Sequence, residues 1–409
     1  MDLVQVAIIA DDLTGAADSG VQLARAGYRA AVAFRGTSVE KDFDAVVADT
    51  DSRFLAPGLA RERVLEAGRE LKDARIAYKK IDSTLRGPIA AEIAAAMEVM
   101  RREKAIIAPA FPGAGRSTRG GAQLVDGVPV HEAGFADDPL TPVWGSHVPS
   151  LLADVGRVET LSVDDLRDAG SVREALGAAD CVVVDAESEA HLEALVRAAP
   201  DPSSVLWAGS AGLAAAIGAV YPGPGVGGRT EPPSSASGVL VVVGSVHEVA
   251  REQLRRLVSG AEIEAVPLDA SEVAEGRAAE AVERAFIAAL ASFEEGKSVA
   301  LHSTIGEASD RASDDISVRV ADALAEVAVE FSKTGSLEAL VLTGGDTAVR
   351  VARKLGGRGI LIEREIEPGV PAGALVGTRP YRVVTKAGGF GGPDTLKDAV
   401  RHLLGKEGA

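Results

Sequence analysis

The sequence predicts two α/β domains, each built around a mainly parallel sheet. Short apolar runs of strand length alternate with longer amphipathic segments along most of the 409 residues. This alternation is typical of parallel sheets that are covered by helices. A Pro-, Gly- and Ser-rich stretch, residues 221–237, interrupts it. We therefore expect an N-terminal domain over 1–225 and a C-terminal domain over 237–409, joined by a linker about which the two domains close.

In the first domain, the buried-strand pattern starts at once with Val6-Ala-Ile-Ile-Ala10. Residues 112–147 are rich in Gly, Pro and Asp, and we expect a long loop or hairpin excursion there. Ser210 is expected to cap the helix that follows it. The remaining predicted strands are 29–34, 45–49, 75–81, 105–110, 181–185 and 204–208, and the predicted helices are 16–25, 59–71, 88–101 and 188–198.

The second domain repeats the alternation after the linker. Its strand-like runs end in Gly, Ser or Thr, and a helical pattern follows most of them. Gly356-Gly357 is expected to end one of these helices. The predicted strands are 239–243, 298–302, 339–342 and 381–385, and the predicted helices are 248–257, 315–331 and 348–355.

The bulk composition limits the functions that the chain can have. The net charge is −17, from 60 acidic and 43 basic residues, so we expect neither nucleic acid nor an anionic membrane as a partner. The single cysteine, Cys181, lies in an apolar run and is expected to be an unreactive core thiol. No apolar run approaches the ~20 residues of a membrane span. With no signal-peptide pattern at the acidic start, we expect a cytoplasmic protein.

Two adjacent carboxylates, Asp11 and Asp12, lie on the turn between the first strand and its helix. In open α/β sheets, ligands bind in the crevice at the carboxyl ends of the strands. Thr14 is available as the N-cap of the helix. The alternative is that one Asp caps the helix and the other is merely solvated, since carboxylates at helix N-termini are favourable without any function.

Basic and hydroxyl side chains gather at two further strand ends of the same domain. Lys79 to Gly87 contributes Lys80, Asp82, Ser83, Thr84 and Arg86, and Arg53 follows the strand at 45–49. These groups suit a small anion, because Arg binds a carboxylate through two parallel hydrogen bonds. Asp12 or Asp82 would then remain as a base. The residues Arg116-Ser-Thr-Arg119 could add to the site. The alternative is that these charges are ordinary solvated ones.

The second domain carries its candidate site in glycine-rich turns. Gly244-Ser245, Gly344-Gly345-Asp346-Thr347 and Gly388-Gly389-Phe390-Gly391-Gly392 each follow a predicted strand. Backbone amides beside a helix N-terminus can bind the phosphates of a nucleotide. No turn matches the P-loop or the dinucleotide fingerprint, and structural turns remain the alternative. His302 and Ser303 fit either a nucleotide contact or packing. The six His residues lack metal-ligand spacing, which argues against a His-based metal centre.

Taken together and in this order, these segments resemble the four-carbon acid sugar kinases, which phosphorylate threonate, erythronate or 3-oxo-tetronate with ATP. The resemblance covers nearly the whole chain. One departure is His131-Glu-Ala-Gly-Phe135, where the family has a Thr shortly before Asp137-Asp-Pro139; this bears on the choice of acid. The segments that carry the resemblance are 8–18, 51–53, 79–87, 108–112, 244–245, 343–347 and 386–391.

The resemblance implies an N-terminal domain that binds the sugar acid and a C-terminal domain that binds ATP. It implies that Asp11, Asp12, Arg53 and the Lys80–Arg86 stretch hold the acid, and that Ser245, Gly344–Thr347 and Gly388–Gly391 hold ATP. We expect Mg²⁺ as a cofactor, without being able to name its protein ligands, and Asp12 ahead of Asp82 as the catalytic base. A homodimer is compatible with the sequence. Two rivals are a nicotinamide-dependent oxidoreductase, against which the missing GxGxxG argues, and a non-catalytic sugar-acid sensor.

Overall fold

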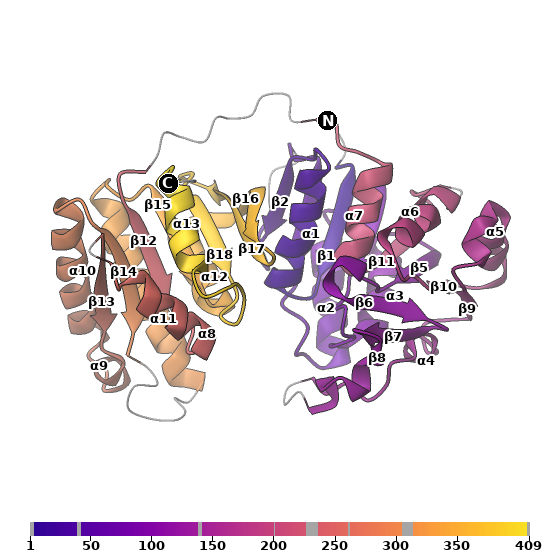
Figure 1. The fold of residues 1–409 in the computed structure, drawn as a ribbon, viewed down its shortest axis with the longest axis horizontal. Helices are drawn as coiled ribbons and strands as arrows, with labels where there is room; N and C mark the ends of the chain where they lie inside the picture. Colours follow the sequence, from indigo (N-terminus) through magenta and orange to yellow (C-terminus); the bar gives the residue numbers. More distant parts are fainter. Residues whose placement is uncertain are drawn as a thin grey trace. The chain divides into compact units, whose positions relative to one another are not determined.

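The computed structural model describes residues 4–38, 42–137, 141–199, 201–225, 236–260, 262–304 and 314–406. The chain divides into two compact units, Met1–Gly227 and Gly228–Ala409. Most of the predicted linker, residues 226–235, lies outside the described residues, as does the closure that we expect about it. We describe each unit by itself (Figure 1, where the sequence runs from indigo to yellow).

Unit 1 contains a parallel sheet with the strand order β2-β3-β1-β4-β11-β5-β10-β9. Residues of β1, β3, β4 and β11 are buried along their whole length, because helices cover both faces of a parallel sheet. The strands are β1 (Val6–Ala10), β2 (Ala30–Ala33), β3 (Ala45–Asp49), β4 (Ile76–Lys80), β5 (Lys104–Ala108), β9 (Val158–Leu161), β10 (Cys181–Val184) and β11 (Val205–Gly209).

The helices of unit 1 form two packed groups: α2 packs with α3, whereas α1 packs with α7 and α7 with α6 (Figure 1). Ser210 caps α7 by accepting from the Gly212 N–H, as predicted. The pair β9–α5 was not predicted, because β9 exposes two of its four residues and therefore lacks an apolar run. The helices are α1 (Leu13–Arg25), α2 (Pro57–Gly68), α3 (Ile89–Val99), α4 (Val148–Leu151), α5 (Ala169–Ala178), α6 (Glu189–Ala198) and α7 (Ala211–Val220), with 3-10 turns η1 (Pro112–Ala114), η2 (Val130–Glu132), η3 (Phe135–Asp137) and η4 (Asp165–Arg167).

The predicted excursion is confirmed as a small antiparallel sheet of β6 (Arg116–Arg119), β7 (Ala122–Val125) and β8 (Val128–Pro129). Its first turn has positive φ at Gly120 and Gly121, a conformation that glycine adopts without strain. The buried carboxylate of Asp185, just after β10, accepts both backbone N–H groups of this turn at 2.6 and 2.9 Å. The excursion is thereby fastened to an end of the main sheet.

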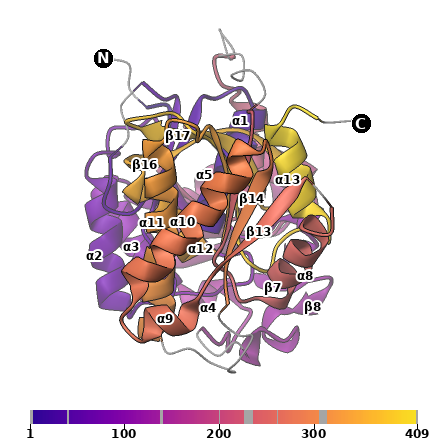
Figure 2. The ribbon, with the colours of Figure 1, turned by 90° about the vertical axis from the view of Figure 1, so that its left-hand side faces the viewer.

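Unit 2 has the strand order β13-β14-β12-β15-β18-β17-β16, parallel up to β18 and antiparallel beyond it. Figure 2 shows α10 lying across β13 and β14. The strands are β12 (Val239–Val243), β13 (Ile263–Leu268), β14 (Ser298–Ser303), β15 (Ala339–Thr343), β16 (Gly357–Glu367), β17 (Val370–Gly377) and β18 (Arg382–Lys386); the helices are α8 (Glu248–Leu257), α9 (Ala270–Ala274), α10 (Ala278–Glu294), α11 (Asp314–Lys333), α12 (Gly345–Lys354) and α13 (Thr395–Leu403).

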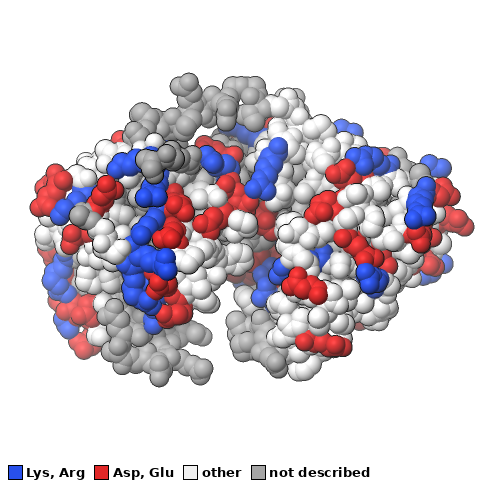
Figure 3. Space-filling model, in the orientation of Figure 1, with Lys and Arg blue, Asp and Glu red and all other residues white. Residues whose placement is uncertain are grey.

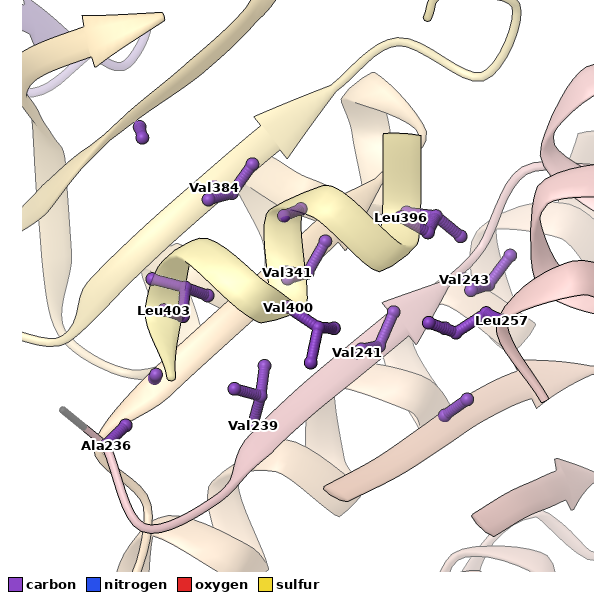
Figure 4. Close-up of a cluster of buried hydrophobic side chains, with 14 of the residues drawn as sticks. Ala236, Val239, Val241, Val243, Leu257, Val341, Val384, Leu396, Val400 and Leu403 are labelled. Carbon is purple, nitrogen blue, oxygen red and sulfur yellow. The ribbon is translucent and has the colours of Figure 1, made fainter. Parts of the chain in front are cut away.

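One core cluster of unit 2 lies between α13 and the sheet (Figure 4). Leu396, Ala399, Val400 and Leu403 recur at helical spacing, so they form one apolar face of α13. This face packs on the apolar side chains of three strands, Val239, Val241, Val243, Ala339, Val341 and Val384. Packing of this kind stabilises the strand ends from which the glycine-rich turns start.

Three parts of unit 2 were not predicted. They are the stretch from β13 to α10, the helix α13, and the hairpin of β16 and β17, which turns at Gly369 with a φ of 79°. In β16, charged residues such as Glu363 and Arg364 stand among the apolar ones, and several of its residues are partly exposed. The apolar signal of a buried parallel strand is therefore missing there.

Acidic and basic side chains are interspersed on the face of the molecule drawn in Figure 3. On α8, for example, Arg255 pairs with Glu248 at 2.6 Å and Arg256 pairs with Glu252 at 2.9 Å. Within the described ranges, no helix combines the length and the apolar character needed to cross a bilayer.

Candidate active site

The site of unit 1 is organised by one buried guanidinium. Arg53 is 7% exposed. It donates from Nε and Nη2 to the Asp11 carboxylate at 2.7 and 3.1 Å, and from Nη1 and Nη2 to the Asp12 carboxylate at 2.8 and 2.7 Å. Four of its five N–H groups are thus directed at two carboxylates, and one on Nη1 remains. The structure brings Asp11, Asp12 and Arg53 together as predicted from their strand ends.

The local backbone explains why Arg53 reaches these carboxylates. Because β1 and β3 are paired in register, Asp11 and Thr50 leave the sheet side by side. The carbonyl of Asp11 accepts the N–H groups of Ser52 and Arg53 at 2.8 and 3.2 Å, and the chain turns at Asp51 with a φ of 48°. A non-glycine residue in this left-handed region is uncommon. The turn directs the Arg53 side chain back over the end of β1.

The two neighbouring carboxylates differ in proton affinity. For Asp11, burial favours the neutral form, but the charges of Arg53, Lys79 and Lys80 together hold its pKa below the usual range. Burial raises the pKa of Asp12, the charge of Asp11 adds to this effect, and Arg53 opposes it. The Asp12 side chain is also 24% exposed, whereas that of Asp11 is 1% exposed. Asp12 is therefore the carboxylate that can meet a ligand and take up a proton.

Asp12 also caps helix α1, the position for which the sequence suggested Thr14. Its Oδ1 accepts the Gly15 N–H at 2.9 Å, which makes Asp12 the N-cap of α1 in place of Thr14. The reason is that α1 begins at Leu13, so Thr14 is already inside its first turn. The alternative in which one Asp caps the helix is therefore correct for Asp12. Its neighbour Asp11 is not solvated, as that alternative supposed, but buried against Arg53.

Asp82 is paired with Arg86 on the turn after β4. Arg86 donates from Nε to Asp82 Oδ2 at 2.7 Å, and Thr84 donates its hydroxyl proton to the same oxygen. Burial would raise the pKa of Asp82, but the charges of Arg53 and Arg86 hold it well below the usual range. Asp82 is therefore a weaker base than Asp12. The Arg53 Nη2 lies 3.9 Å from Asp82 Oδ1, which joins this pair to the Asp11–Asp12 cluster.

The two lysines that end β4 have different surroundings. Lys79 is fully buried and pairs with the buried Glu92 of α3 at 3.1 Å. Lys80 donates to the Ile81 carbonyl at 3.0 Å. A Cβ on Gly15 would lie 2.8 Å from Lys80 Nζ and 2.7 Å from Asp12 Oδ1. The ammonium of Lys80 therefore shares the N-terminus of α1 with Asp12, while Lys79 is part of the core beneath them.

The excursion meets this site through a residue that the sequence did not single out. Gln123, on β7, donates from Nε2 to the Ser83 carbonyl at 2.8 Å and accepts the Thr118 hydroxyl at 2.7 Å. A buried amide in a polar hairpin has no distinctive sequence pattern. In contrast, Arg119 has a 68% exposed side chain and pairs with Glu187, so its side chain makes no contact with the Asp11–Asp12 cluster among the described residues.

The one departure from the family pattern, at residues 131–135, falls in the excursion. His131 approaches Ser146 through its Nδ1 at 2.7 Å, so this segment is anchored within the excursion. Residues 138–140 of the predicted Asp137-Asp-Pro139 region lie outside the described residues.

In unit 2 the three glycine-rich turns lie against one another. A Cβ on Gly388 would come within 1.9 Å of Ser245 Oγ, and one on Gly344 would lie 3.2 Å from the Ser245 nitrogen. A Cβ on Gly244 would come within 2.0 Å of Thr347 Oγ1. These approaches exclude side chains, which explains the glycines physically. The structure thus gathers Ser245 and the turns 344–347 and 388–391 at one edge, as predicted.

The turn after β15 opens a helix earlier than predicted. Gly344 has a φ of 95° and precedes α12, which begins at Gly345 rather than at 348. Because the left-handed Gly344 reverses the chain at once, Gly345, Asp346 and Thr347 form the first helical turn. Unpaired N–H groups and the positive end of the helix dipole there favour an anion.

Phe390 and Gln253 complete this edge. Phe390 is 44% exposed, and its ring lies where a Cβ on Gly369 would come within 2.3 Å. Gln253, on α8, donates from Nε2 to the carbonyls of Phe390 and Gly392 at 3.1 and 2.7 Å. Gln253 therefore fixes the glycine-rich turn. Its role was missed because a Gln on an amphipathic helix looks like an ordinary polar residue.

The described residues contain no group of three or more His, Cys, Asp and Glu side chains placed to hold a metal ion. A magnesium ion needs few protein ligands when it arrives on nucleotide phosphates. Asp346, exposed in the first turn of α12, is a carboxylate that such an ion could meet.

Known protein families match the N-terminal and the C-terminal part of the chain separately. Residues 6–217 match a family described as a sugar-binding N-terminal domain, and residues 240–396 match one described as a nucleotide-binding C-terminal domain. The fold resembles that of Haemophilus influenzae protein HI1011, with a TM-score of 0.79 at 24% identity over 97% of this chain and 100% of the other.

Curated relatives match over nearly their full lengths. D-threonate kinase of Salmonella typhimurium is 35% identical over 98% of both chains. D-erythronate kinase of Heliobacterium modesticaldum is 32% identical over 98% of this chain and 97% of its own. For 3-oxo-tetronate kinase of Pseudomonas fluorescens, the identity is 30% over 97% and 96%. These relatives support a carbohydrate-acid kinase and give no support to an oxidoreductase. The chain belongs to the family of four-carbon acid sugar kinases.

Proposed function

We propose that this protein transfers the γ-phosphoryl group of ATP to a hydroxyl of a four-carbon sugar acid, and that D-threonate is its substrate. The observation that carries the proposal is the state of Asp12, a partly exposed carboxylate of raised pKa that Arg53 holds at the carboxyl end of β1. Support for threonate comes from the D-threonate kinases, which are 34–35% identical to this chain, against 28–30% for the 3-oxo-tetronate kinases.

In the proposed reaction, Asp12 accepts the proton of the attacking hydroxyl. The hydroxyl oxygen forms a bond to the γ-phosphorus as the bond to the β,γ-bridging oxygen breaks, and ADP leaves. Asp82 is unsuited to this task because Arg53 and Arg86 keep it charged and engaged. Most of the rate enhancement in such reactions comes from positioning and charge stabilisation.

The carboxylate of the sugar acid would be bound by donors that the internal pairs leave available. These are the remaining Nη1 N–H of Arg53, the ammonium of Lys80 and the hydroxyl of Ser83, while Thr84 and Arg86 are engaged with Asp82. Arg53 would act mainly by holding Asp11 and Asp12 in place, since four of its N–H groups serve them. Binding at the carboxylate end fixes which hydroxyl faces the phosphate.

In unit 2, ATP would be bound by backbone amides of the turns at Ser245, Gly344–Thr347 and Gly388–Gly391. The N-terminus of α12 supplies N–H groups for the phosphates. Mg²⁺ would be held by those phosphates, with Asp346 as a protein contact, and it would neutralise their charge.

An ADP-release assay with Mg-ATP tests the proposal. It compares D- and L-threonate, D- and L-erythronate and the 3-oxo acids. We expect turnover with D-threonate in preference to the other acids. Turnover of D-erythronate in its place would keep the kinase and overturn the substrate. Silence across the panel with ATP still bound would move the acceptor outside the four-carbon acids, and an absorbance change of a nicotinamide cofactor would favour the oxidoreductase.

A further inference from the structure

A third buried lysine besides Lys79 and Lys80, Lys386, ends β18 in the sheet of unit 2. It is 3% exposed and stands next to Thr343 of β15 in the parallel register. Its carbonyl accepts the Gly344 N–H at 3.1 Å, and the glycine-rich turn that contains Gly388 follows it directly. Lys386 therefore lies where the turns of the candidate nucleotide site begin.

The ammonium of Lys386 has only neutral hydrogen-bond partners among the described residues. Nζ donates to Thr343 Oγ1 and to the Gly388 carbonyl, both at a long 3.3 Å. An ammonium has three N–H donors, so a third is left over in this part of the chain. Burial lowers the pKa of Lys386 to about 8, because a charge removed from water without an opposite charge beside it is destabilised.

The charged groups around Lys386 do not compensate it. Glu367 of β16 acts on it only through space, and its Oε2 accepts the Gly392 N–H and the Thr395 hydroxyl at 2.9 and 2.8 Å. His247, at the start of α8, faces Gly389, where a Cβ would lie 3.2 Å from its Nε2. The exposed Asp346 lies in the first turn of α12. The ammonium thus remains a buried positive charge held by a hydroxyl and a carbonyl oxygen, at the edge where the glycine-rich turns start.

Lys79 of unit 1 shows what a structural buried lysine looks like in the same chain. It also ends a central parallel strand and is fully buried, but a carboxylate oxygen of Glu92 lies 3.1 Å from its Nζ. Burial of an unpaired charge is costly and is retained where a ligand completes the pair. The difference between the two lysines indicates that the anion for Lys386 comes from outside the chain.

We propose that Lys386 is a catalytic residue that binds the terminal phosphates of ATP. This inference rests on the proposed kinase function and assigns to Lys386 the positive charge that faces the transferred group. In the reaction, its ammonium would stabilise the negative charge that develops on the β,γ-bridging oxygen as that oxygen leaves with ADP, while the hydroxyl proton goes to Asp12. A pre-formed cation in a buried site stabilises such charge strongly.

The test compares Lys386→Met, Lys386→Arg and, as an unaffected control, Lys333→Met, whose exposed lysine on α11 pairs with Glu330 at 2.6 Å. Nucleotide affinity is measured by titration with AMP, ADP and a non-hydrolysable ATP analogue, without the sugar acid. We expect Lys386→Met to weaken binding of the ATP analogue roughly tenfold and to lower kcat by about 10²–10³. Its AMP affinity and its melting temperature should be at least those of the wild type.

The pH dependence separates a phosphate-binding role from a structural one. Between pH 7.5 and 9, wild-type affinity for the ATP analogue should fall as Lys386 loses its proton. Lys386→Arg should keep a flat profile, because arginine stays charged, and Lys386→Met should be flat and weak.

Wild-type behaviour of Lys386→Met in binding and turnover would overturn the inference. Equal losses of AMP and ATP binding together with a lower melting temperature would also overturn it, because Lys386 would then be structural. Failure of the wild type to bind ATP at all would instead overturn the proposed function.

Discussion

Arg53, Arg86 and Lys79 in unit 1 each have a carboxylate partner, whereas Lys386 in unit 2 has none among the described residues. The two strand-end sites also differ in the chemical groups that they present to a ligand. Unit 1 presents charged side chains that are mostly paired, with the Lys80 ammonium left on a backbone carbonyl. Unit 2 presents glycine-rich turns beside a lysine that has no carboxylate partner among the described residues. The comparison is sharp because both sites lie at the carboxyl ends of buried parallel strands.

The difference follows from the ligands that we propose. A sugar acid carries one negative charge and several hydroxyls, so a nearly neutral cluster with a few remaining donors can select it without binding every anion. ATP brings several negative charges, so its site gains from positive charge that is completed only when the nucleotide binds. The paired cluster of unit 1, formed by Asp11, Asp12 and Arg53, should therefore contribute to the stability of the fold. The ammonium of Lys386 in unit 2 should contribute to ligand binding.

The largest effect expected is that of Arg53→Met on the stability of unit 1. The change leaves Asp11 and Asp12 without their shared partner, and breaking a buried ion pair costs about 3–5 kcal/mol. Urea unfolding followed by tryptophan fluorescence measures it, since both tryptophans, Trp144 and Trp207, belong to unit 1. Arg61→Met, which breaks an exposed pair with Glu98, should change stability by less than about 1 kcal/mol. Equal urea midpoints for the two variants would show that the cluster does not stabilise unit 1.

Next in size is the effect of Asp12→Asn on turnover. Loss of a general base lowers kcat by about 10²–10⁴, and the nucleotide affinity of unit 2 should not change. The pKa of Asp12 is raised, so wild-type kcat/KM should fall as the pH drops through that pKa and Asp12 becomes protonated. This acid limb should persist in Asp82→Asn, because the lowered pKa of Asp82 keeps that group charged. Wild-type turnover by Asp12→Asn would remove Asp12 as the base.

Much of this comparison could be predicted from the sequence. Apolar runs that end in polar or glycine residues locate strand ends, and parallel pairing brings those ends to one edge. This reasoning is sufficient to gather Asp11, Arg53 and Asp82, and separately Ser245 and Gly388. It works because buried parallel strands have a strong apolar signal and short, recognisable ends.

The pairing of charges could not be predicted in the same way. Arg53 was expected to meet a ligand carboxylate, and its geometry instead directs most of its donors to Asp11 and Asp12, which depends on the left-handed turn at Asp51. Whether a lysine has a buried partner depends on a helix elsewhere, as Glu92 of α3 shows for Lys79. The hairpin of β16 and β17 was missed because partly exposed strands carry charged residues.

A smaller effect concerns Asp49, which ends β3 beside the paired cluster and lines a cavity of about 340 Å³. It is 5% exposed, and its Oδ1 accepts the Asp51 N–H at 2.9 Å. Burial raises its pKa from the 3.8 of an ordinary aspartate to about 7. Between these values the folded state holds a proton that the unfolded state releases, so this stabilising contribution is lost as pH rises toward 7.

We therefore expect Asp49→Asn to be more stable than the wild type at pH 8 by about 2 kcal/mol, with a smaller advantage at pH 5. The amide can still accept the Asp51 N–H, so the turn should be preserved. Urea unfolding at the two pH values measures the difference. A stability advantage of Asp49→Asn that does not change with pH would show that Asp49 is charged in the folded protein at both pH values. A carboxylate without a cationic partner would then lie beside the paired cluster.

The smallest effect is expected for Gly388→Ala in unit 2. The new Cβ would come within 1.9 Å of Ser245 Oγ and 2.8 Å of Ser245 Cβ, so the two turns must separate slightly. We expect KM for ATP to rise roughly tenfold with little change in melting temperature, a cost of about 1.4 kcal/mol. Gly260→Ala is the matched control, because a Cβ there would meet nothing within 4 Å.

Ser245→Ala in the Gly388→Ala background decides whether the two turns touch in the working protein. Removing Oγ takes away the closest contact, so the double variant should recover part of the lost affinity, after allowance for the effect of Ser245→Ala by itself. Residues in contact give such non-additive effects, and distant ones do not. Additive losses would mean that the turns bind ATP independently, and the contact between Ser245 and the turn at Gly388 would then play no part in binding.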